Sequence, residues 1–144
     1  MAEPLRQRFE TETIAPVPSP AISPRARGAY SLLLVAFVVA PIVAGIDKFL
    51  HLLVNWDQYL APAIADLVPV ARDMLMRGVG VVEVVAGLIV LAKPSVGGWL
   101  VALWLWGIIV NLALIPGYYD IMLRDFGLSL GAIALARLAR DFGR

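Results

Sequence analysis

Four long apolar runs, separated by short segments rich in proline, glycine and charge, follow the first 28 residues of the chain. A helix of about 20 apolar residues can cross the hydrocarbon layer of a bilayer, so each run predicts a membrane-spanning helix. We therefore expect an all-α integral membrane protein, with a four-helix bundle over residues 29–139. The predicted helices cover about residues 30–54, 70–93, 97–115 and 118–138.

The segments that flank these helices are more polar. Residues 1–28 contain five prolines and few large apolar side chains, so they predict a disordered tail that cannot bury enough surface to fold alone. Between the first two helices, residues 55–69 contain Trp56 and Tyr59, and both residue types favour the headgroup zone of a bilayer. We expect this segment to lie at a membrane surface, and residues 140–144 to form a short basic tail.

Composition supports the membrane assignment. Of the 144 residues, 60% are hydrophobic and 16% are charged, whereas a soluble domain is about half apolar and a quarter charged. The net charge of +1 gives no global field for binding nucleic acid. The chain has no cysteine, one histidine and no Glu-x-x-His pair, so we expect it to hold no disulfide, haem, zinc or di-iron centre by itself.

Glu83 is the only ionisable residue in the apolar stretch 78–92. An acidic side chain at the centre of a membrane helix costs about 3 kcal/mol on insertion scales, so Glu83 needs a cationic partner, a proton or a water-lined cavity. It could accept a proton beside a substrate, or it could pair with a cation to hold the helices in register. The cations considered as its partner are Lys48, Arg77 and Arg124.

Two helices carry polar residues at helical spacing. In the second helix, one stripe is expected to face the bundle, because small residues let helices approach closely; it consists of Asp73, Arg77, Gly80, Glu83 and Gly87. In the fourth helix, Asp120 and Arg124 stand four residues apart, which is the spacing of a helix ion pair. We expect this pair to face the other helices and Asp125 to point elsewhere. Arg124 or Lys48 could instead bind an anion or a quinone carbonyl.

The first and third helices add further polar candidates. If the first helix continues to about residue 54, Asp47 and His51 lie one turn apart on one face. His51 is then either a hydrogen-bonded structural residue or a donor to a ligand. In the third helix, Trp104 shares a face with Asn111, and its ring could stack on an aromatic headgroup or simply pack.

Four spans place both termini on one side of the membrane. Most cations near the helix ends fall on that side, namely Arg25, Arg27, Lys93, Arg137, Arg140 and Arg144. The positive-inside rule then predicts cytoplasmic termini in a bacterial inner membrane. The intramembrane polar groups converge on the outer half of the bundle, in a candidate pocket formed by Asp47, Lys48, His51, Glu83, Trp104, Asn111, Asp120, Arg124 and Asp125.

Three segments in this order resemble the DoxX-like family of small bacterial membrane proteins. They are residues 45–62 (GIDKFLHLLVNWDQYLAP), 79–90 (VGVVEVVAGLIV) and 111–135 (NLALIPGYYDIMLRDFGLSLGAIAL). The resemblance covers the four predicted helices and implies a four-helix membrane bundle. Named members of this family include a subunit of a thiosulfate:quinone oxidoreductase. The family supplies no agreed catalytic residues, so the candidate pocket depends on the physical argument above.

From this resemblance we expect a small subunit, or a quinone-facing partner, in membrane redox metabolism. Quinone would be its ligand, and any electron-carrying metal would belong to another membrane or redox protein. Two alternatives stay open. The chain could be a structural or assembly subunit without chemistry, in which the polar core only fixes helix order, or it could be a small-solute carrier. The bilayer is the expected partner in every case, and a homo-oligomer is compatible with each.

Overall fold

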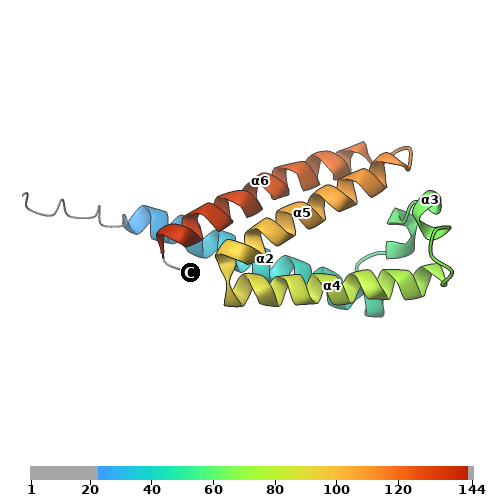
Figure 1. Ribbon diagram of the computed structural model, residues 1–144, viewed down its shortest axis with the longest axis horizontal. Helices are drawn as coiled ribbons and strands as arrows, with labels where there is room; N and C mark the ends of the chain where they lie inside the picture. The colour runs from blue at the N-terminus through green and yellow to red at the C-terminus, as the bar shows by residue number, and fades with distance from the viewer. Residues whose placement is uncertain (1–22, 143–144) are drawn as a thin grey trace, which may run out of the picture.

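A computed structural model describes residues 23–142 of the chain, and most of these residues are helical and none forms a strand. Four long helices follow one another along the chain (Figure 1). They are α2 (Pro24–Leu50), α4 (Arg72–Ala92), α5 (Pro94–Ala113) and α6 (Tyr119–Asp141). Between α2 and α4 lie two short elements, the 3₁₀ helix η1 (Trp56–Tyr59) and the single-turn helix α3 (Pro62–Ala65). They occupy the segment that the sequence predicted to be interfacial.

The bounds of α2 differ from the predicted ones at both ends. The helix begins at Pro24, where the Ser23 side chain accepts a hydrogen bond from the backbone N–H of Ala26. Residues 24–28, which the sequence analysis placed in the tail, are therefore helical, and residues 1–22 lie outside the described part. The helix ends at Leu50, because the next residue adopts a left-handed conformation with φ of 52°.

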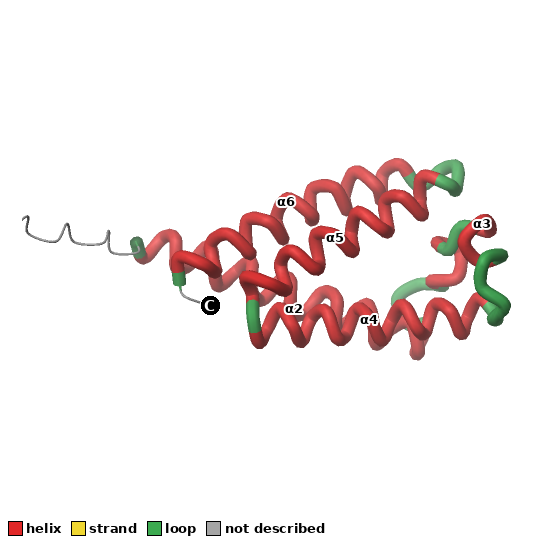
Figure 2. The backbone as a smooth tube through the Cα atoms, viewed as in Figure 1, coloured by secondary structure: helices red, strands yellow, loops and turns green. Residues whose placement is uncertain are grey.

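The four long helices pack as two pairs. Helix α2 lies against α4, and α5 lies against α6, with the short α4–α5 turn joining the pairs. In Figures 1 and 2 the two pairs converge at this turn and diverge toward the end that holds η1 and α3. Consecutive helices run antiparallel, so α2 begins and α6 ends at the convergent end.

Glycine sets the closest approach within each pair. A Cβ atom on Gly45 would lie 2.5 Å from the carbonyl oxygen of Gly80, so the backbones of α2 and α4 touch at this point. Between α5 and α6, a Cβ atom on Gly98 would lie 2.6 Å from the carbonyl oxygen of Ala132. A larger side chain at these positions would push the helices of a pair apart.

The main apolar core lies toward the convergent end. It includes the buried side chains of Phe37, Val90, Val101 and Leu135, one from each long helix. At that end Tyr30 of α2 stacks on the ring of Phe142 at a centroid distance of 4.6 Å, which closes the seam between α2 and the end of α6. A second, smaller cluster at the opposite end packs η1 and α3 on α4 through Leu60, Ala65 and Met76.

Three helices within residues 23–142 are long and apolar enough to cross a membrane, namely α2, α4 and α5. Helix α6 has a similar length but carries six charged residues, and it does not meet the same criterion. The sequence predicted four spans, and membrane crossing remains a prediction for all four helices.

Candidate functional site

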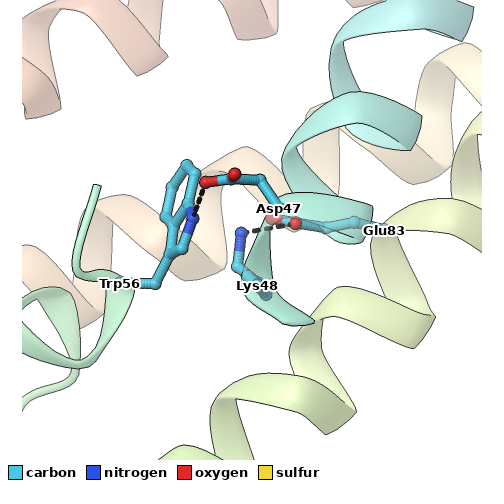
Figure 3. Close-up of polar contacts among 4 residues, drawn as sticks. All are labelled: Asp47, Lys48, Trp56 and Glu83. Carbon is cyan, nitrogen blue, oxygen red and sulfur yellow. Dashed lines mark hydrogen bonds and ion pairs between the residues drawn. The ribbon is translucent and has the colours of Figure 1, made fainter. Parts of the chain in front are cut away.

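A buried ion pair joins α2 to α4 at the level where their backbones touch. The Lys48 Nζ atom lies 2.5 Å from Oε2 of Glu83, and the two residues are 3% and 6% exposed (Figure 3). Gly45 and Gly80 are each three residues away on the same helices, so the close approach of the glycines brings the two long side chains together. Of the three cations considered as partners of Glu83, the structure selects Lys48.

Trp56 of η1 covers this ion pair from the loop side. The Lys48 ammonium lies 3.7 Å from the centroid of the indole ring, which is the geometry of a cation–π contact. The Nε1 atom of the same indole donates a hydrogen bond of 2.7 Å to Oδ2 of Asp47 (Figure 3). One aromatic side chain thus contacts both charged residues of the last turn of α2. The sequence analysis assigned Trp56 only to a membrane surface, and no spacing rule links it to Lys48.

Asp47 ends α2 and turns the chain back over it. Its carboxylate accepts hydrogen bonds from the backbone N–H groups of Leu52 and Leu53, at 2.9 and 3.1 Å. These bonds satisfy donors that a continuing helix would have paired with carbonyl groups. The expectation that Asp47 and His51 share a helical face is therefore wrong. The helix has ended before His51, and this residue is exposed.

Asn111 fastens the same loop to α5. Its side-chain oxygen accepts a hydrogen bond of 2.9 Å from the backbone N–H of Ala61, and its amide nitrogen donates one of 2.5 Å to the carbonyl of Tyr59. The Tyr59 ring also packs edge-on against Tyr118, just before α6, at 5.3 Å. Asp47 and Asn111 thus hold the η1–α3 segment across the end where the helix pairs diverge. Both side chains form hydrogen bonds with backbone groups of the loop.

Helix α6 presents the opposite face to the one predicted. Asp120 and Arg124 are exposed, whereas Asp125 is 4% exposed, and the Arg124 Nε atom lies 3.2 Å from Oδ1 of Asp125. The predicted Asp120–Arg124 pair does not form. The inward face of α6 is a row of small residues that follows Asp125 at helical spacing, and these residues allow close packing on α5. They are Ser129, Ala132, Ala136 and Ala139.

The polar stripe predicted on α4 is only partly inward. Gly80, Glu83 and Gly87 are buried, and the first two contact α2 as described above. Asp73 and Arg77 are about half exposed and pair with each other at 3.6 Å, one turn apart on the outside. They lie in the first two turns of α4, before the helix packs closely on its partner.

Trp104 of α5 places its indole N–H beside the Glu83 carboxylate and acts on it as a hydrogen-bond donor, although the two groups do not reach the geometry of a full hydrogen bond. Its Nε1 atom is buried and has no hydrogen-bond partner in the described part of the chain. The indole lies near the Glu83 carboxylate, and Asp125 of α6 lies close enough for its charge to act on the same group. A buried indole N–H usually finds an acceptor, and the carboxylate beside this one is that of Glu83.

The structure therefore gathers part of the predicted pocket and disperses the rest. Contacts toward the divergent end link Asp47, Lys48, Glu83, Trp56, Trp104 and Asp125, and Asn111 binds the loop that carries Trp56. His51, Asp120 and Arg124 are exposed at its margin. Within residues 23–142, no group of three or more His, Cys, Asp and Glu side chains is placed to hold a metal ion.

Comparison with known proteins gives no match. No family model fits the chain, and neither a curated protein nor a solved structure is significantly similar to it. The geometry of the site provides a fixed ammonium, three buried carboxylates and one buried indole N–H that makes no full hydrogen bond.

Proposed function

We propose that the chain is an integral membrane protein of the DoxX-like kind, whose four long helices cross a bacterial inner membrane. Three of them have the required length and apolarity, and α6 would insert because its inward Asp125 is shielded by the other helices. The exposed Arg124 lies near the start of α6, where a long side chain can reach the headgroup zone. The surplus of cations at the convergent end supports cytoplasmic termini.

We further propose that the site at the divergent end binds the headgroup of a quinone, and that the chain serves as a small subunit of a membrane redox system. The buried Trp104 N–H, which makes no full hydrogen bond although it lies beside the Lys48–Glu83 pair, is the observation that carries this proposal. A quinone carbonyl is a neutral acceptor that would satisfy this donor without adding a charge. A hydrophobic quinone would reach it from the bilayer.

The chemistry of the site then divides between two sets of side chains. Trp104 would donate to a carbonyl oxygen, while the Lys48–Glu83 pair keeps the surroundings polar and nearly neutral. Asp47 and Asn111 would hold the loop that carries Trp56 against the site. The proposal is restricted to binding and orientation, and electrons would be exchanged with a partner protein.

A binding titration tests this assignment. We would titrate the purified full-length protein in detergent with a short-chain ubiquinone and follow quenching of tryptophan fluorescence. Trp104→Phe should weaken binding about fivefold, since a neutral hydrogen bond contributes about 1 kcal/mol. Trp99→Phe is the matched control, because Trp99 is 41% exposed at the other end of α5. Quenching that does not saturate, or that is equal in both variants, would exclude the quinone site.

A second candidate function is that of a structural subunit. Asp47 and Asn111 use their polar atoms on the backbone of their own chain, and Lys48 and Glu83 use theirs on each other. Such self-satisfied groups fix helix order and loop position without any ligand. A protein of this class would keep its partners and its stability in Trp104→Phe, whereas a quinone protein would lose ligand affinity.

A further inference from the structure

The two ends of the helix bundle differ in whether acidic residues follow the helix N-termini. Helices α4 and α6 begin at the divergent end, and each has an aspartate in its first turn, Asp73 and Asp120. Helices α2 and α5 begin at the convergent end, and neither has an acidic residue in its first turn. A helix N-terminus carries a partial positive charge that an acidic side chain normally offsets. The convergent end lacks this compensation.

Exposed cations increase the positive charge of the same end. Five basic side chains lie there, on the first turn of α2, at the α4–α5 turn and in the last turns of α6, and all of them are exposed. None of the five is part of an ion pair within residues 23–142, and Asp141 is the one acidic residue of the described helices at this end. We refer to this set as the basic end, which consists of Arg25, Arg27, Lys93, Arg137 and Arg140.

An aromatic stack holds part of the basic end in place. The Arg27 guanidinium lies 5.9 Å from the centroid of Phe142, and Phe142 is stacked on the buried ring of Tyr30. Arg27 is thus positioned over the seam between α2 and α6. Arg137 and Arg140 stand three residues apart on α6, so they share one face of that helix.

We propose that the basic end binds the phosphate groups of anionic phospholipids, which supply the negative charge that the chain itself omits there. Guanidinium groups match phosphate oxygens in a bidentate geometry, and uncompensated helix N-termini attract the same anions. The inference depends on the proposed membrane insertion. It does not depend on the quinone site, which lies at the other end of the helices.

Native mass spectrometry of the full-length protein tests the proposal. The protein would be released from detergent after addition of phosphatidylglycerol or phosphatidylcholine, and bound lipids would be counted. Each basic side chain near an anionic surface contributes about 1 kcal/mol, which corresponds to about a fivefold preference. The double variant Arg27→Gln/Arg140→Gln should therefore reduce the preference for phosphatidylglycerol by about 25-fold, and Arg27→Lys/Arg140→Lys should keep most of it.

The divergent end provides the control, because Arg72 and Arg77 are also exposed there but Arg77 is paired with Asp73. Arg72→Gln/Arg77→Gln should leave the preference for phosphatidylglycerol unchanged. An equal loss in both double variants, or no preference in the native protein, would overturn the inference. Displacement of the lipid by an equal concentration of inorganic phosphate would also overturn it, in favour of a small-anion site. Failure of membrane insertion would appear separately, as protein extracted from membranes by alkaline carbonate.

Discussion

Removing Lys48 alone should destabilise the protein more than removing both partners of the Lys48–Glu83 pair. Lys48→Met leaves the Glu83 carboxylate in a site where it is 6% exposed, with the carboxylate of Asp125 nearby and no cation in contact. Breaking a buried ion pair in this way costs about 3–5 kcal/mol of unfolding free energy, because the remaining charge is neither hydrated nor neutralised. The substitution also removes the contact of Lys48 with the Trp56 ring.

The reverse substitution, Glu83→Gln, is expected to cost less. The Lys48 ammonium keeps the Trp56 ring at 3.7 Å, and a buried cation–π contact contributes about 2 kcal/mol. The amide of glutamine also leaves an acceptor near the ammonium. We expect a loss of about 2 kcal/mol for this variant. In the double variant Lys48→Met/Glu83→Gln neither charge remains, so it should be more stable than Lys48→Met alone.

The assay is a double-mutant cycle of four proteins: the native chain, Lys48→Met, Glu83→Gln and the double variant. Each is unfolded by titration in mixed micelles of dodecyl maltoside and SDS and followed by circular dichroism. Its control is the same cycle on Asp73 and Arg77, which are about half exposed at 3.6 Å and should couple by less than about 0.5 kcal/mol. If the Lys48 and Glu83 losses simply add, or if Lys48→Met costs less than 1 kcal/mol, then the pair does not form in the folded protein.

Four further substitutions test the loop contacts, the packing and the orientation of α6, with the same unfolding assay. Asn111→Leu should cost about 2–3 kcal/mol, because it leaves the N–H of the fully buried Ala61 unpaired; amide exchange at residues 59–61 should rise, and unchanged exchange would contradict the contact. Gly45→Ala should cost about 1–3 kcal/mol by pushing α2 off Gly80, whereas Gly107→Ala has open space and should gain up to about 1 kcal/mol; equal effects would refute the close approach. Asp120→Asn should change stability by less than about 0.5 kcal/mol, since Asp120 is exposed; a loss above about 1 kcal/mol would place it inside.

Hydrophobic runs predicted the helices well because length and apolarity are local properties. The four runs correspond to α2, α4, α5 and α6, and Glu83 has the cationic partner that its apolar setting required. The end of α2 was missed for a different reason. The apolar pattern continues past Leu50, but the Asp47 carboxylate captures the next N–H groups, and this tertiary effect leaves no periodic signal.

The predicted orientation of α6 was wrong because the charged residues were given more weight than the row of small residues. Asp120 and Arg124 were placed inward on the rule that membrane charges face the bundle, yet both lie near the helix start, where they are exposed. The row of small residues from Ser129 to Ala139 indicates the true packing face, and Asp125 continues it by one turn. That signal was present in the sequence. The roles of Trp56 and Asn111 could not be predicted from the sequence, because they depend on how the loop folds over the helix ends.

Labelling of single cysteines tests the central claim, that four helices cross the membrane with the Lys48–Glu83 pair between them. The chain has no cysteine of its own, so each introduced thiol reports one position. With a membrane-impermeant maleimide on intact bacteria, Gln58→Cys and Tyr119→Cys should react, whereas Ser95→Cys and Asp141→Cys should react only after permeabilisation. Reaction of Asp141→Cys on the same side as Tyr119→Cys would show that α6 does not cross, and would contradict the account.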